Sequence, residues 1–210
     1  EEKEEIKEEA VLRLKNIGDI ERLMSKIATQ KVAPRELIQL KNSLLELVPL
    51  KAALVDSSEK VLQSLGLGLH NCDELIETLR STLREEAPVS TTKGDFIADG
   101  FSEELDELRK IAYSGKDYLA QIQQRESVKH GIPSLKISFN NVFGYYIEVR
   151  NTHKDKVPEE WIRKQTLVSA ERYITEELKE YETKILGAEE KIQVLETKIF
   201  SELVFALSEY

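Results

Sequence analysis

Basic residues gather between Lys129 and Arg172, in a chain that is acidic as a whole. The 210 residues carry 30 basic and 39 acidic side chains, for a formal net charge of −9. The segment from Lys129 to Arg172 holds eight basic and five acidic residues, a net charge of +3, which leaves −12 on the rest. Clustered Lys and Arg side chains bind phosphate groups. The local charge therefore keeps a nucleic-acid backbone open as a partner.

Several basic side chains of this segment are spaced so that they could reach one phosphate backbone. Lys136 lies on the polar face of a predicted strand, and the others lie in or beside a polar loop. A loop that is merely solvated is the alternative. Six aromatic residues lie in this segment or directly after it, and we interpret them as core because a small sheet must bury large side chains. The loop residues are Lys154, Lys156, Arg163 and Lys164, and the aromatic residues are Phe139, Phe143, Tyr145, Tyr146, Trp161 and Tyr173.

Other kinds of chemistry find little support. Cys72 is the one cysteine and the three histidines share no ligand-like spacing, so we expect neither a disulfide nor a metal site. Neighbouring carboxylates such as Glu103 and Glu104 lie on charged helix faces, where solvation explains them. The chain lacks both G-x-x-x-x-G-K-[ST] and G-x-G-x-x-G. We expect no catalytic residue and no bound cofactor, and we interpret Cys72 as a buried structural thiol.

Membrane and secretion signals are also missing from the sequence. No stretch approaches the roughly 18 apolar residues of a membrane span, and residues 1–9 are mostly acidic. We therefore expect a soluble protein in a reducing, intracellular setting. Met24 is the only methionine, so the chain has no initiator and is either processed or part of something longer. We favour the second interpretation.

Helices should position the basic segment. Upstream we predict four of them: one after the N-cap Asp19, one from Pro34 that Pro49 ends or kinks, one over Ser58–Leu65 that Gly66 and Gly68 stop, and one from about Asp73. Residues 88–100 are predicted to form a loop or short hairpin.

Two long helices with heptad spacing flank the segment. The first begins after the N-cap Ser102 and runs to about His130. Gly115 and Gly187 either mark close approach of backbones or are simply tolerated. The first seam is Leu105, Leu108, Ala112, Gly115, Leu119 and Ile122, and the second is Leu178, Tyr181, Ile185, Ala188, Ile192, Leu195 and Ile199.

Between the long helices the pattern predicts β structure. Residues 135–139 alternate with period two, Asn140-Asn141 is a turn signal, and residues 144–150 are rich in β-formers. Residues 165–168 add a possible strand before a helix that begins near Ser169. The predicted fold is therefore mainly α: a helical body with two long antiparallel heptad helices that carry a small β-rich insert at their tip.

Five runs of residues resemble one known family. Leu135–Val149 (LKISFNNVFGYYIEV), Arg163–Ile174 (RKQTLVSAERYI) and Glu177–Glu182 (ELKEYE) resemble the clamp region of bacterial MutS, the DNA mismatch-recognition ATPase family. Ile17–Leu23 (IGDIERL) and Ala98–Arg109 (ADGFSEELDELR) are similar to the lever region. The resemblance implies a lever at 1–125 and 176–210 with a clamp at 126–175.

The resemblance also implies a function and partners. Two clamps of a dimer would close around duplex DNA through its phosphates, while ATP and Mg²⁺ would bind elsewhere in the parent protein. We expect no membrane or small-molecule partner and a bacterial cytoplasmic, nucleoid-associated location. The alternative is a structural coiled-coil assembly module without DNA contact. The residues expected to face DNA are Lys136, Asn151, His153, Lys154, Lys156, Arg163, Lys164 and Ser169. Arg172 is left out of this set, because Glu171 and Tyr173 indicate a packed helix start there.

Overall fold

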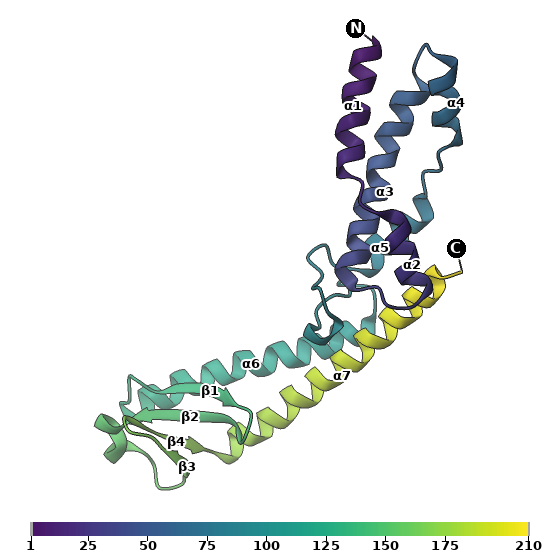
Figure 1. Cartoon of the computed structure of the whole chain (residues 1–210). Helices are drawn as coiled ribbons and strands as arrows, with labels where there is room; N and C mark the ends of the chain where they lie inside the picture. Colours follow the sequence, from purple (N-terminus) through teal and green to yellow (C-terminus); the bar gives the residue numbers. More distant parts are fainter. Residues whose placement is uncertain (1, 210) are drawn as a thin grey trace. The chain divides into compact units, whose positions relative to one another are not determined.

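The computed structural model describes residues 2–209, with side chains from residue 4, and it is mostly helical with one small sheet (Figure 1). The contacts divide the chain into two compact units. Unit 1 comprises residues 1–102 and 193–210, and unit 2 comprises residues 103–192. No helix within the described range is long and apolar enough to cross a membrane. The predicted boundaries at residues 125 and 175 stay predictions.

Unit 1 is built around one helix, α3. It contacts α1, α2, α4 and α5, and its buried face includes Leu37 and Leu40. The ring of Phe96 is fully buried and meets Phe200 of α7 edge-on at 5.6 Å between centroids. The helices are α1 (Glu2–Asn16), α2 (Ile20–Ala28), α3 (Pro34–Val55), α4 (Lys60–Gly68), α5 (Asp73–Thr82), the 3₁₀ turn η1 (Thr91–Lys93) and the last turns of α7 (Glu176–Leu207).

The predicted helix starts in unit 1 are confirmed to within two residues, and α4 ends at Gly68 as predicted. Pro49 does not end α3 and Gly66 does not end α4, so these two stops are wrong, while a kink at Pro49 stays a prediction. Asp19 caps α2 by accepting a hydrogen bond from the backbone N–H of Arg22 at 2.9 Å. Pro49 lies inside α3, which continues to Val55 because the helix packs on four other helices. Gly66 lies inside α4, where a Cβ would come within 2.9 Å of the Leu54 side chain. This glycine serves close packing of α4 on α3 rather than helix termination.

Unit 2 consists of α6, the sheet and the first turns of α7 (Figure 1). The sheet is antiparallel throughout, in the order β1-β2-β4-β3, so the chain between β2 and β3 crosses β4. Its elements are α6 (Glu103–His130), β1 (Lys136–Asn140), β2 (Gly144–Arg150), the 3₁₀ helix η2 (Asn151–Lys156), β3 (Ile162–Thr166) and β4 (Ala170–Ile174). β3 has an irregularity in its register between Arg163 and Gln165.

The helix expected near Ser169 is absent, and that prediction is wrong. Residues 170–174 form β4, the strand that pairs with β2 on one side and β3 on the other. The helix α7 begins only at Glu176, two residues after the end of β4. Ala170, Glu171 and Arg172 favour helices by propensity, but pairing on both edges and burial of Tyr173 outweigh that local preference.

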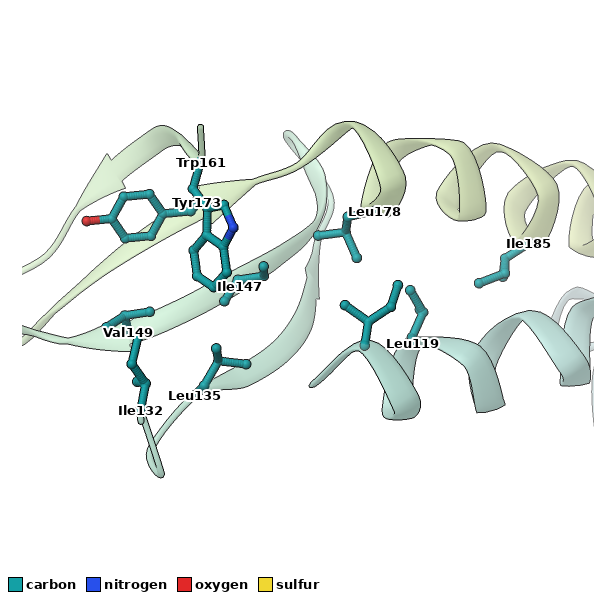
Figure 2. Close-up of a cluster of buried hydrophobic side chains, with 10 residues drawn as sticks. Leu119, Ile132, Leu135, Ile147, Val149, Trp161, Tyr173, Leu178 and Ile185 are labelled. Atoms are coloured by element: carbon teal, nitrogen blue, oxygen red, sulfur yellow. The ribbon is translucent and has the colours of Figure 1, made fainter. Parts of the chain in front are cut away.

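The core of unit 2 lies on one face of the sheet (Figure 2). Ile147 and Val149 of β2 are fully buried there with Trp161 and Tyr173, and Leu178 and Ile185 of α7 continue the cluster. Tyr146, Trp161 and Tyr173 are buried as expected of core aromatics, whereas Phe139 is 45% exposed. The apolar cluster therefore joins the sheet to both long helices within unit 2.

The predicted heptad faces are largely buried. In α6 the side chains of Leu105, Ala112, Leu119 and Ile122 are buried. Gly115 contacts α7 closely, because a Cβ there would lie 2.5 Å from Cγ1 of Ile185. The antiparallel heptad pairing of α6 and α7 itself stays a prediction.

Candidate nucleic-acid interface

The candidate phosphate-binding residues of the loop lie on η2 and β3. Arg150 ends β2, and the chain turns at once into η2, which carries Asn151, His153, Lys154 and Lys156. All are exposed except His153, which is half-buried. After Trp161 anchors the chain in the core, β3 runs along the sheet edge with every residue exposed. The sequence thus folds a polar loop and an edge strand next to the middle strands.

Lys154 and Lys164 are the two most available cations of the set. Both are exposed, and neither side chain has a hydrogen bond or ion pair within the described part of the chain. Lys164 lies at the register irregularity of β3, between Arg163 and Gln165. An extra residue at such a point re-aims its side chain relative to the strand. These two ammonium groups can therefore meet an anion without breaking an internal contact.

Arg163 and Lys156 have internal partners. Nη1 of Arg163 lies 3.2 Å from Oε1 of Glu171, and the other oxygen of Glu171 accepts a hydrogen bond from the hydroxyl of Tyr173. The Tyr173 hydrogen bond, with the charge of Arg163, lowers the pKa of Glu171. Burial raises the pKa of Tyr173 to about 12, and its bond to Glu171 adds to the rise. Nζ of Lys156 donates to the carbonyl of Gly131 at 2.9 Å.

Asn151 is hydrogen-bonded to the turn that contains Ser169. The backbone N–H of Asn151 donates to the carbonyl of Ser169 at 3.0 Å, and its side-chain amide donates to the carbonyl of Val168 at 3.0 Å. The side chain of Ser169 itself is exposed. The structure thus brings η2 and the turn between β3 and β4 together.

A row of polar residues crosses the other face of the sheet. Glu148 of β2 is in register with Lys136 of β1 and with Arg172 of β4. The guanidinium of Arg172 binds Glu148 at 2.9 Å and Gln165 at 2.9 Å, and it lies 4.4 Å from the Tyr146 ring centroid. Arg172 is therefore engaged within the sheet, whereas Lys136 is exposed.

One exposed basic residue was left out of the predicted set. Arg150 lies at the end of β2, directly before Asn151, and it is paired in register with Ala170. Because side chains alternate along a strand, the pattern of β2 puts Arg150 on the same face as Glu148 and Tyr146. That alternation was the signal that could have selected it. Arg150 extends the basic residues of η2 onto this face.

Both long helices are hydrogen-bonded to the sheet or to its β1–β2 turn. Gln123 of α6 accepts a hydrogen bond from the N–H of Ile137 in β1 at 2.8 Å. On α7, Lys179 donates to the carbonyl of Phe143, and Glu182 accepts from the N–H of Tyr145. Lys179 and Glu182 also bond each other at 2.8 Å. The turn between β1 and β2 is thereby fixed to α7.

Nothing in the described residues resembles a metal centre. No group of three or more His, Cys, Asp or Glu side chains within residues 2–209 could hold a metal ion. Cys72 is not buried as expected: it is half-exposed and precedes α5 in a left-handed conformation, with φ of 56°. The end of a loop at a helix start leaves this thiol partly open to solvent.

Comparisons with known proteins agree on one family. The family model described as MutS family domain IV matches residues 100–191. DNA mismatch repair protein MutS of Flavobacterium johnsoniae is 61% identical over 94% of this chain, and that match covers 23% of the relative. MutS of Parabacteroides distasonis is 59% identical over 98% of the chain and 24% of the relative, and MutS of Porphyromonas gingivalis is 56% identical over 94% and 22%.

The chain spans about a quarter of the length of the curated relatives it matches. The matches cover nearly the whole chain at high identity, and the domain IV match takes in all of α6 and of the sheet with the first turns of α7. The chain therefore belongs to the MutS family, with residues 100–191 as its domain IV.

Proposed function

We propose that this chain is the lever and clamp region of a MutS-type DNA mismatch repair ATPase, in which the sheet end of unit 2 holds duplex DNA by its backbone. The observation that carries the proposal is the pair of exposed cations Lys154 on η2 and Lys164 on β3, whose side chains make no hydrogen bond or ion pair in the described part of the chain, within a family whose relatives are named as DNA mismatch repair proteins. Arg163, Lys136 and Arg150 add further positive charge to the same end of unit 2.

The expected contact is to phosphates and is independent of base sequence. Lys and Arg side chains on a loop and an edge strand position a protein on DNA, whereas base recognition needs an element that enters a groove. The available cations are few, so the affinity of one chain for duplex DNA should lie near the weak end of about 10⁻⁴ to 10⁻⁶ M. A second protomer with its own clamp would strengthen the grip in the parent protein.

The contacts between α6, α7 and the sheet support a role in transmitting conformational change to the basic residues. We propose that α6 and α7 pack antiparallel, since Arg125 contacts Glu177 while Lys116 lies 2.5 Å from Glu189, so that contacts run in opposite order along the two helices. Stacked rings of Tyr118 and Tyr181, with centroids 4.0 Å apart, lie between these ion pairs. Because both helices also bond the sheet, a shift of one helix against the other would move the basic residues.

The rest of the activity is proposed for the parent protein. ATP and Mg²⁺ would bind outside this chain, which would itself catalyse no reaction. The partners would be duplex DNA and a second MutS protomer, in the bacterial cytoplasm near the nucleoid. The alternative of a coiled-coil assembly module without DNA contact finds no support in the comparisons, all of which name DNA mismatch repair proteins.

A charge-reversal experiment tests the DNA contact. In the double variant Lys154→Glu/Lys164→Glu we expect affinity for a fully paired duplex to fall by roughly tenfold or more at low salt. The slope of log affinity against log salt should shrink by about two, one for each lost phosphate contact. Binding is measured by fluorescence anisotropy over a range of salt concentrations.

The matched control changes the net charge equally elsewhere. Lys31 and Lys60 of unit 1 are exposed lysines, and Lys31→Glu/Lys60→Glu should leave the slope unchanged. Equal affinities for the two double variants would contradict the clamp proposal and favour the assembly module.

A further inference from the structure

One residue joins the two segments that carry the exposed cations. Asn151 at the start of η2 hydrogen-bonds two consecutive carbonyls, those of Val168 and Ser169, at 3.0 Å each. These carbonyls belong to the turn between β3 and β4, seventeen and eighteen residues further along the chain. The side-chain amide and the backbone N–H of Asn151 each supply one of the two bonds. Asn151 therefore bridges η2 and the β3–β4 turn.

The turn has few other attachments. Its own closing bond is the N–H of Leu167 to the carbonyl of Ala170 at 2.8 Å. Val168, at the centre of the turn, is fully exposed and so has no apolar anchor. The strand that leads into the turn, β3, lies at the sheet edge and is irregular at Lys164. Local order at this end of β3 therefore depends strongly on the bonds from Asn151.

The hydrogen bond to Val168 also bears on whether the Asn151 side chain can contact a phosphate directly. A phosphate oxygen only accepts hydrogen bonds, so a contact from Asn151 would have to come from its amide N–H groups. The amide nitrogen is directed at the carbonyl of Val168. This bond uses one of the two amide N–H groups, and it links two backbone segments whether or not the other N–H group meets an anion.

We infer that Asn151 is a positioning residue, which holds the β3–β4 turn against η2 so that Lys154 and Lys164 form one surface. This inference rests on the proposed function, because it assigns Asn151 a role in the same DNA contact. Without these hydrogen bonds the end of β3 and η2 would move independently. DNA binding would then have to order both segments, which lowers the affinity. The assignment of Asn151 as a direct DNA contact stays a prediction, which the second test below distinguishes from the positioning role.

The first test measures the turn without DNA. In the full 210-residue chain, Asn151→Ala removes the side-chain bond and leaves the backbone bond. We expect amide hydrogen exchange over residues 167–170 to speed up by about fivefold, the equivalent of one net hydrogen bond. Thr152→Ala is the control, since Thr152 is the exposed neighbour and its side chain has no hydrogen bond within the described residues. Unchanged exchange in Asn151→Ala would overturn the inference.

The second test separates positioning from contact by a double-mutant cycle. Duplex affinity is measured for Asn151→Ala, Lys164→Ala and the double variant. If Asn151 acts by positioning Lys164, its substitution should cost about fivefold when Lys164 is present and much less when it is absent. Independent, multiplying losses would show a direct contact and overturn the inference. If the unchanged chain did not bind DNA, the proposed function would be rejected. The exchange test, which needs no DNA, would still show whether Asn151 orders the β3–β4 turn.

Discussion

Gly115 of α6 lies so close to Ile185 of α7 that a methyl group on its Cα would come within 2.5 Å of Cγ1 of Ile185. Real Cβ atoms essentially never approach another carbon so closely. Ile185 is fully buried in the core of unit 2, so it cannot simply swing away. The contact makes this glycine a requirement of how the two helices pack.

The pair Gly115 and Gly187 allows a controlled stability test. In Gly115→Ala the clash with Ile185 should cost about 1–3 kcal/mol of unfolding free energy against a gain in helix propensity of roughly 1 kcal/mol, so the net effect should be a loss of up to about 2 kcal/mol and no stabilisation. Gly187 is also inside a helix, but a Cβ there would meet nothing within 4 Å. Gly187→Ala should therefore stabilise unit 2 by about 0.5–1 kcal/mol. Urea unfolding followed by circular dichroism measures both, and equal shifts would contradict the close contact.

Gly144 provides a second matched pair with Gly100. Both have positive φ, +80° and +79°, so alanine is strained at either position by roughly 1–2 kcal/mol. At Gly144 the new Cβ would also meet the carboxylate of Glu182, whereas at Gly100 it meets nothing within 4 Å. Glu182 would have to give up its bond to the N–H of Tyr145. We expect Gly144→Ala to cost about 1–2 kcal/mol more than Gly100→Ala in thermal unfolding.

The acid stability of unit 2 should depend on Glu177. A hydrogen bond from Arg125, with one from the Tyr118 hydroxyl, lowers the pKa of Glu177 below its usual value of 4.5. A carboxylate with a depressed pKa in the folded state stabilises the fold above pH 4.5 and loses this contribution as the pH falls through the folded-state pKa. Because Glu177 is about a third exposed, the contribution should be roughly 0.5–1 kcal/mol.

The measurement compares two neighbouring substitutions across pH. Glu177→Gln should lower the unfolding free energy at pH 7, and the difference from the unchanged chain should vanish toward pH 3. Glu176→Gln is the control, since Glu176 is exposed and has no ion-pair partner in the part of the chain that is described. A difference that stayed constant with pH would show that the Arg125 contact does not act through charge.

Local signals predicted the helix starts and the strand β2 from the sequence. Asp19 and Pro34 act at the first turn of their own helices, so neighbouring residues suffice to predict their roles. The stops at Pro49 and Gly66 failed because packing between helices decided them. β4 was missed for the same kind of reason, since its strand state comes from pairing with β2 and β3 rather than from Ala170 or Glu171.

The sequence predicted which residues make up the candidate site, but it did not predict their hydrogen bonds and ion pairs within the fold. Charge clustering pointed to Lys154 and Lys164 without any knowledge of the fold. It could not show that Arg163 is paired with Glu171, or that Lys156 donates to Gly131, because these bonds join residues eight and twenty-five positions apart through folding. Asn151 was selected by its position within the motifs that resemble the family, and only the positions of Val168 and Ser169 in the fold show what it binds.

The strand β3 leaves an open row of backbone groups, since it lies at one edge of the sheet with all five residues exposed. Such edges can template pairing with another chain and start aggregation. Arg163 and Lys164 put two like charges at the point where the strand departs from regular register. Charge and irregularity both hinder an incoming strand. The residues proposed to hold DNA thus also protect the free protein against joining edge to edge with its own copies.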